Sequence, residues 1–266
     1  GGRVHDGRRR ISKGTHLLIL NADTYMDTGT LEIAAAYIAK HPSHSYMQLD
    51  IRKYDKSNMD GEACIFGMDR FGYPIWKVSG EPFYADAAAM IIQRDLFFKL
   101  GGFDESYFIY LEDLDLAWRA RLLGKQIHYI PQSYVYHFAG GTSVSTQNKK
   151  GSYVTTVRRR YDAQKNNLRS ILKNFELFNV VWILPTSCAM ASIEGFLYLL
   201  KGNISGFIAL HKSILWNITH LTDTLAERKK MQSTRTISDK QLFEKIDKRI
   251  SKLHSLLLFG VPSMKK

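Results

Sequence analysis

The sequence has few cysteines, and this scarcity excludes two kinds of small protein. Cys64 and Cys188 are the only two in 266 residues, and they lie far apart without CxxC or Cys/His spacing. A disulfide framework or a cysteine-rich zinc site needs more cysteines, closer together. We therefore expect two reduced thiols in a cytosolic setting.

Targeting and repeat signals are also missing. The opening GGRVHDGRRRISKG carries basic residues with no apolar core behind them and no initiator Met, so we expect no signal peptide. Internal repeats and low-complexity tracts are absent from the sequence. Hydrophobic residues make up 45% of the chain, which is enough to bury a sizeable core.

Acidic residues are scarce in the second half of the chain. Residues 1–157 hold 18 Lys and Arg against 17 Asp and Glu, whereas residues 158–266 hold 19 against 8. Such asymmetry favours nucleic acid or an anionic membrane surface as a partner. A solvated basic face explains most charge runs, but here long apolar blocks interrupt the charge. Because no DNA- or RNA-binding module is recognisable, we expect no nucleic acid partner.

Strand and helix patterns alternate in the first half, which predicts an α/β fold with a mostly parallel or mixed sheet over residues 1–140. Past residue 158 the patterns are helical, and residues 177–193 carry no charge. The segments expected as strands are 15–24, 45–55, the start of 85–102 and 125–137, and those expected as helices are 28–42, the end of 85–102, a stretch from Phe108 and 158–175.

The stretch FIYLEDLDLAWRARLLG, residues 108–124, bunches carboxylates among aromatic residues. On a helix from Phe108, four apolar side chains share the core face, and Asp115 pairs with Arg119 at i,i+4. That pairing is a sufficient structural role for Asp115. Glu112 and Asp113 remain, and stabilisation of a helix N-terminus and catalysis explain them equally well.

Several motifs occur in an order that resembles one enzyme family. GGFDESYFIYLEDLDLAWR is similar to the Gly-Gly-Phe-Asp-Glu…Glu-Asp-x-Asp-Leu-x-x-Arg signature of inverting family-2 nucleotide-sugar glycosyltransferases. LLILNADT resembles their Asp-x-Asp strand end, AAAMIIQRDLFFKLGGFDE the approach to their acceptor site, and YVYHFAGGTS their His-x-x-Gly-x-Ser segment. The rhamnosyltransferase-like branch, with Asn-x-Asp, is the most similar, over roughly residues 1–175.

The resemblance implies a GT-A (Rossmann-like) mixed sheet that lacks its first strands, and the change in charge and pattern after residue 157 bounds the partial catalytic domain at 1–157. Residues 158–266 are then a basic and apolar helical region associated with the membrane. Arg158 to Arg160 either fold over a diphosphate or form a basic surface patch. The resemblance implies these site residues: Asp113 as general base, Glu112 and Asp86 at the acceptor, Asn21, Asp23 and His137 at the donor, with Asp23 and His137 on a metal.

The implied reaction moves a sugar from a dTDP- or UDP-linked donor to a hydroxyl of a cell-surface glycan or polyprenyl-linked acceptor. Mg²⁺ or Mn²⁺ is the implied cofactor, although Asn21 offers a neutral amide where many relatives have a carboxylate. A lone His is more often structural than a ligand, and for His137 both roles remain open. The alternative function is a non-catalytic glycan- or nucleotide-binding module.

The apolar stretch 176–220 is expected to lie in the membrane interface at the cytoplasmic face, as a peripheral or monotopic element. Its uncharged run of 17 residues is at the lower limit for a span. A buried helical hairpin and a single span are the alternatives.

Overall fold

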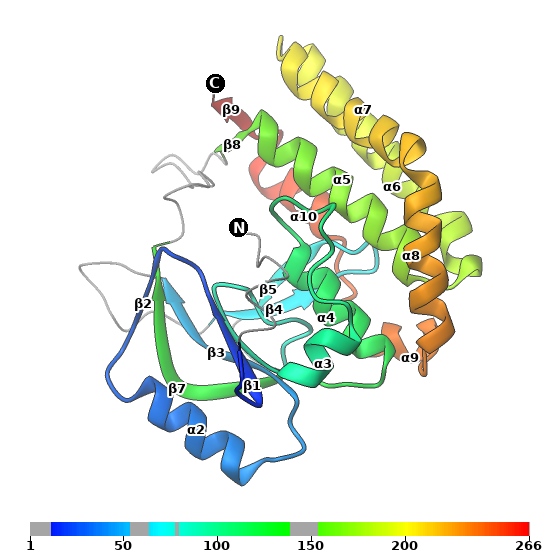
Figure 1. Cartoon of the computed structure of the whole chain (residues 1–266). Coiled ribbons are helices and arrows are strands. Elements are labelled where there is room, and N and C mark those ends of the chain that lie inside the picture. The colour runs from blue at the N-terminus through cyan, green and yellow to red at the C-terminus, as the bar shows by residue number, and fades with distance from the viewer. Residues whose placement is uncertain (1–11, 54–63, 78–79, 139–153, 266) are drawn as a thin grey trace. The chain divides into compact units, whose positions relative to one another are not determined.

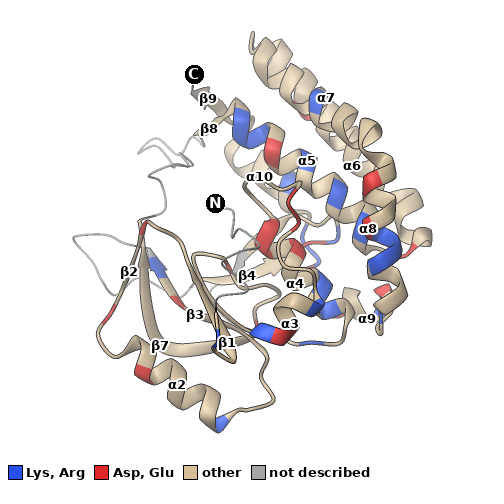
Figure 2. Ribbon diagram, viewed as in Figure 1, with Lys and Arg blue, Asp and Glu red and all other residues tan. Residues whose placement is uncertain are grey.

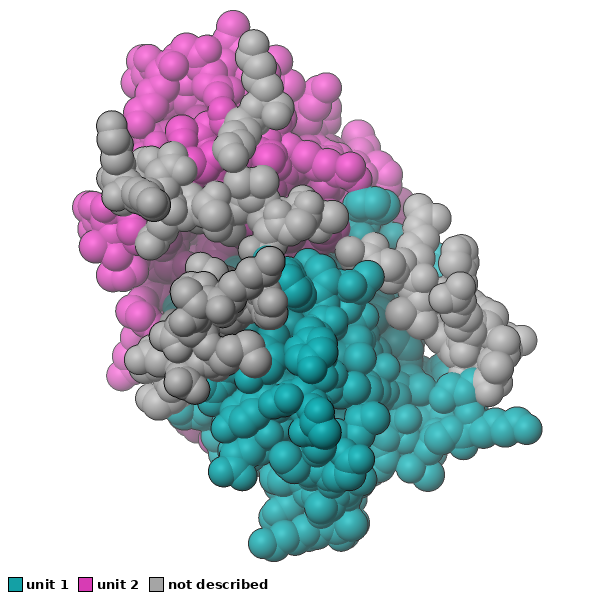
Figure 3. All heavy atoms as spheres, turned by 90° about the vertical axis from the view of Figure 1, so that its left-hand side faces the viewer, with its two compact units in different colours: residues 1–68, 74–108, 112–141 teal, residues 69–73, 109–111, 142–266 magenta. Residues whose placement is uncertain are grey.

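The computed structural model describes residues 12–53, 64–77, 80–138 and 154–265. The chain divides into two compact units, coloured separately in Figure 3. The first unit comprises residues 1–68, 74–108 and 112–141, and the second comprises 69–73, 109–111 and 142–266. The boundary at residue 157 that we expect from composition stays a prediction.

The first unit is built on a five-stranded mixed sheet in the order β1-β6-β3-β7-β2 (Figure 1). Neighbouring strands are antiparallel except β3 and β7, which are parallel. The sheet strands are β1 (His16–Leu20), β2 (Thr24–Met26), β3 (Tyr46–Lys53), β6 (Ala89–Gln93) and β7 (His128–His137). The prediction of a mixed sheet is confirmed.

Apolar sequence explains why the central strands lie where they do. Residues 89–92 of β6 are all buried, as expected for a short continuous apolar run between two neighbouring strands. Helix α2 packs on β7, and α3 packs on β6. The remaining elements of this unit are α2 (Thr30–Lys40), the hairpin β4 (Ile65–Met68) and β5 (Pro74–Lys77), α3 (Arg94–Lys99) and α4 (Glu112–Leu122).

Helix α4 begins later than its sequence pattern predicts. The expected start near Phe108 is wrong, because Tyr110 and Leu111 have φ of 70° and 65° and cannot belong to a right-handed helix. Phe108 is exposed. The apolar face is confirmed, since Leu114, Trp118 and Leu122 are all fully buried.

The second unit is helical, and its helices α5, α6 and α7 pack on one another. Helix α5 starts at an N-cap, where the Thr156 hydroxyl accepts a hydrogen bond from the Arg159 amide. The elements are β8 (Val154–Thr156), α5 (Val157–Asn174), α6 (Leu177–Leu200), α7 (Ile204–Thr219), α8 (Leu221–Thr234), α9 (Asp239–Phe243), α10 (Ser251–Phe259) and β9 (Ser263–Lys265).

Candidate active site

The Asn-x-Asp motif lies just beyond the carboxyl end of β1. The backbone N–H of Asn21 donates to the backbone carbonyl of Ala88. The backbone carbonyl of Asn21 accepts a hydrogen bond from the Thr24 hydroxyl at 2.7 Å. These bonds fix the turn that leads into β2. The motif is therefore held by backbone contacts to the segment before β6.

Pairing of β2 with β7 brings Asp23 to His137. Thr24 lies opposite His137 in the register, and the Phe138 amide donates to the Asp23 carbonyl. The Asp23 Oδ1 to His137 Nε2 distance is 3.2 Å, with both side chains partly exposed. Two residues 114 positions apart in sequence thus form one polar pair, as the family resemblance implies. Among the described residues no group of three or more His, Cys, Asp or Glu has the arrangement of a metal site.

A second polar group gathers at the first turn of α4, which Figure 2 shows in red at the start of that helix. Asp113 Oδ2 accepts a hydrogen bond from the Ala87 amide at 3.2 Å, and its Oδ1 accepts from the Leu114 amide at 2.7 Å. Asp86 Oδ1 accepts from the Ala88 amide at 2.7 Å. The consecutive backbone amides of Ala87 and Ala88 therefore fix the carboxylates of Asp113 and Asp86, respectively.

The carboxyl groups of Asp86, Glu112 and Asp113 affect one another's pKa values. Burial, followed by the charges of Asp86 and Glu112, raises the pKa of Asp113 well above its ordinary value. Burial and then Asp86 raise the pKa of Glu112, whose Oε2 is buried without a hydrogen-bond partner among the described residues. The group has the chemistry of a proton acceptor poised above the usual carboxylate range.

Asp86 connects the two groups electrostatically. Burial raises the pKa of Asp86, His137 opposes that shift, and Asp23 adds to it. Asp86 in turn raises the pKa of Asp113. Asp86 therefore interacts electrostatically with the Asp23–His137 pair and with Asp113.

Tyr84 is a buried neighbour of this site, and the sequence leaves stacking on a sugar and packing in the core or a loop as its two roles. Its buried side chain lies close enough to Asp113, Asp86 and Glu112 for all three charges to raise the pKa of its hydroxyl, after the larger effect of burial.

The structural role expected for Asp115 is confirmed. Asp115 is fully buried, and its Oδ2 accepts from Arg119 Nε at 2.9 Å. Arg119 also donates to the carbonyls of Leu100 and Gly102, so the guanidinium ties α4 to the Gly101–Gly102 turn.

Two other sequence-predicted segments are placed only in part. Residues 1–11, and the Gly and Ser of the His-x-x-Gly-x-Ser segment at 140–143, lie outside the described residues. Arg158 to Arg160 contact their own unit: Arg160 pairs with Glu194 at 3.2 Å, Arg158 with Asp162 at 3.5 Å, and Arg159 lies over the Tyr110 ring.

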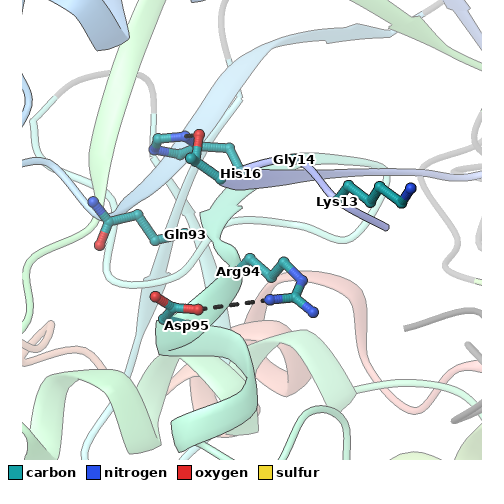
Figure 4. Close-up of a pocket in the computed structure, with 7 residues that line it drawn as sticks. Lys13, Gly14, His16, Gln93, Arg94 and Asp95 are labelled. Carbon is teal, nitrogen blue, oxygen red and sulfur yellow. Dashed lines mark hydrogen bonds and ion pairs between the residues drawn. The ribbon is translucent and has the colours of Figure 1, made fainter. Parts of the chain in front are cut away.

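A pocket of about 400 Å³ lies elsewhere on the first unit (Figure 4). Lys13, His16 and Arg94 line it, at the start of β1 and the end of β6. Asn21 and Asp23 follow the opposite end of β1, so the pocket is separate from the carboxylate site.

No protein-family model matches the chain. The rhamnosyltransferase WbbL of Escherichia coli (strain K12) is 30% identical over 113 residues, which are 40% of this chain and 42% of that protein. The N-acetylglucosaminyl-diphospho-decaprenol L-rhamnosyltransferase of Mycobacterium tuberculosis (strain CDC 1551 / Oshkosh) is 37% identical over 54 residues, 20% of this chain and 18% of that protein. The chain spans less than half the length of these relatives.

Among solved structures, GalNAc-T7 with UDP, GalNAc and Mn²⁺ superposes with a TM-score of 0.53 at 14% identity. The match covers 97% of this chain and 44% of that chain. The fold is therefore that of the GT-A glycosyltransferases. In sequence, the chain is similar to rhamnosyltransferases over at most 113 of its residues.

Proposed function

We propose that the protein is an inverting glycosyltransferase that moves a sugar from a dTDP- or UDP-linked donor to an acceptor hydroxyl. The observation that carries this proposal is the half-buried Asp113, with its raised pKa and its carboxylate fixed by the amides of Ala87 and Leu114. A hydroxyl is a poor nucleophile, and a carboxylate that accepts its proton during attack speeds the reaction by about 10²–10⁴.

We assign the acceptor to the carboxylates at α4 and the donor to the Asp23–His137 pair. Asp113 takes the proton of the acceptor hydroxyl, while Glu112 and Asp86 orient the acceptor. The Glu112 Oε2 has no hydrogen-bond partner among the described residues, which supports this assignment because a sugar hydroxyl can donate to it.

The donor diphosphate is assigned to the Asn21, Asp23 and His137 end of the site. Asp23 and His137, 3.2 Å apart, supply one oxygen and one nitrogen ligand for Mg²⁺ or Mn²⁺. Such an ion would neutralise charge on the leaving diphosphate. Since two such side chains meet here among the described residues, the diphosphate and water would complete the coordination.

The acceptor is proposed to be a glycan or polyprenyl-linked saccharide at the cytoplasmic face of the membrane. Within the described part of the chain, α6 is the one helix long and apolar enough to cross a bilayer, and a third of its most apolar window is buried in the protein. Its Glu194 is buried and pairs with Arg160 and Lys252 at 3.2 Å and 3.0 Å. An acid bound in this way supports a helix that lies on the membrane and packs one side on protein.

A donor screen tests the proposal. Purified protein is given dTDP- and UDP-sugars with and without a polyprenyl-linked saccharide, and released nucleoside diphosphate is measured. The proposal predicts release that depends on the acceptor. Donor binding without release under every condition would instead identify the non-catalytic module.

A further inference from the structure

The turn that leads into α4 has an unusual backbone. Tyr110 and Leu111 both adopt the left-handed conformation, with φ of 70° and 65°, directly before Glu112 and Asp113. Non-glycine residues avoid this region because the side chain crowds the following carbonyl. Two in succession persist only where other contacts hold them.

A buried side chain of α5 contacts the backbone of this turn. Asn166 of α5 is fully buried, and its Nδ2 donates to the carbonyls of Ile109 at 2.9 Å and Tyr110 at 2.7 Å. The amide has two hydrogens, so it serves both carbonyls. Two helical turns earlier, Arg159 places its guanidinium 4.9 Å from the centre of the Tyr110 ring. The same face of α5 thus fixes both the backbone and the side chain of the turn.

We propose that Asn166 is a positioning residue for the transfer reaction, which fixes the left-handed turn and thereby sets Glu112 and Asp113 in place. This inference rests on the proposed function. The hydrogen bond from Ala87 to Asp113 is formed at the second residue of α4, so any shift of the preceding turn moves the base. Small displacements of a reacting group cost about 10²-fold in rate.

Asn167 provides a matched control. It is the next residue of α5, is fully buried, and donates its Nδ2 to a different carbonyl, that of Phe71, at 2.9 Å. Asn166→Ala and Asn167→Ala therefore remove the same group from neighbouring buried positions. Only the first removes a contact to residues 109–110.

The test compares the two variants with the wild-type protein in steady-state transfer. For Asn166→Ala we expect kcat to fall by about 10²-fold with the donor KM unchanged. The acid limb of the kcat–pH profile should also move to higher pH, because a displaced Asp113 loses the Ala87 amide. Asn167→Ala should keep the wild-type kcat and the wild-type position of the acid limb. Equal kcat and pH profiles for two folded variants would overturn the inference.

Hydrogen exchange of the peptide spanning residues 109–116 gives a second, activity-independent measurement. Asn166→Ala should speed exchange there, whereas Asn167→Ala should not. If the wild-type protein transfers no sugar, the proposed function fails and exchange alone decides whether Asn166 holds the turn. Unchanged exchange in Asn166→Ala would contradict the inference whatever the activity.

Discussion

At the scale of single residues, two neighbouring acids of α4 have opposite environments. Asp113 accepts hydrogen bonds from two backbone amides, and burial raises its pKa. Asp115 is paired with Arg119 at 2.9 Å. Ionising Asp113 in the folded protein is costly, whereas Asp115 is the partner of a buried guanidinium.

We expect Asp113→Asn to abolish transfer and to raise the stability of the protein at pH 7. The folded-state pKa of Asp113 lies above its unfolded value, so between these two values stability falls as pH rises. A neutral amide removes that cost. Urea unfolding followed by circular dichroism, at pH 4 and pH 7, measures the effect, and turnover is measured alongside.

Asp115→Asn serves as the matched comparison. It leaves the buried Arg119 without a counter-charge, and we expect a loss of about 3 kcal/mol or more in the free energy of unfolding. Near-normal turnover in folded Asp113→Asn, or a stability ranking opposite to this one, would refute the assignment of roles.

The Asp23–His137 pair predicts a dependence on divalent cations. EDTA should suppress transfer, and Mn²⁺ or Mg²⁺ should restore it, because only a cation joins a carboxylate to a diphosphate. Asp23→Asn should weaken the response to added metal, whereas Asp27→Asn, outside the pair, should not. Full activity in EDTA would mean that His137 and backbone donors stabilise the leaving group without metal.

At the scale of elements, the end of α2 and the start of β7 carry a stack of imidazoles. The ring centres of His44 and His128 are 3.4 Å apart and those of His41 and His44 are 4.8 Å apart. Burial, followed by neighbouring histidines, lowers the pKa of His44 and of His128. Glu81 acts on His128 in the opposite direction, and Arg121 adds to the lowering.

This stack predicts acid sensitivity. An imidazole in the unfolded chain has a pKa of about 6.5. Below that pH, the unfolded chain therefore binds more protons than the folded stack, whose pKa values are lowered. Stability is therefore complete above about pH 6.5 and falls as pH drops through the lowered folded values. His128→Phe keeps a ring but cannot titrate, so its urea midpoint should fall less between pH 7.5 and pH 5. His254→Phe, on α10, is the control, and a wild-type-like acid loss in His128→Phe would show that the stack does not titrate as described.

The elements also show how far sequence patterns reach. Alternation and apolar runs predicted β1, α2, β3, β6, β7 and α5 closely, because each buries a face that its sequence marks. The motifs predicted that Asp23 and His137 share a site, which strand pairing places together. Asn166 was not predicted, since its contacts lie 56 and 57 positions away and nothing in a basic helix marks such an amide. The late start of α4 was missed for the same reason, as the left-handed turn depends on that contact.

At the scale of the whole molecule, the helical second unit presents large apolar side chains to solvent. On α6 these form one group near each end of the helix, and helical spacing places Phe178, Val181, Ile193 and Phe196 on the same face, here called the stripe. Their exposed fractions include 82% for Phe178, 68% for Val181, 59% for Ile193 and 53% for Phe196. Such a surface, in a half of the chain rich in Lys and Arg, suits an anionic lipid interface.

We expect the protein to float with anionic liposomes, and the double variant Val181→Glu/Ile193→Glu to lose that binding. Ala36→Glu, on the exposed face of α2, adds charge away from the stripe and should bind normally. Release from membranes by alkaline carbonate indicates interfacial binding, whereas retention until detergent is added indicates a span. Solubility without lipid at low and high salt alike would contradict both arrangements and leave the stripe as a contact with protein.

The stereochemistry of the product tests the central proposal most directly. Acceptor-dependent product is made with the donor found in the screen, and nuclear magnetic resonance gives the configuration at its anomeric carbon. In-line attack by a hydroxyl that Asp113 deprotonates predicts a configuration opposite to that of the donor sugar. Retained configuration, or product formed equally well by Asp113→Asn, would contradict the account.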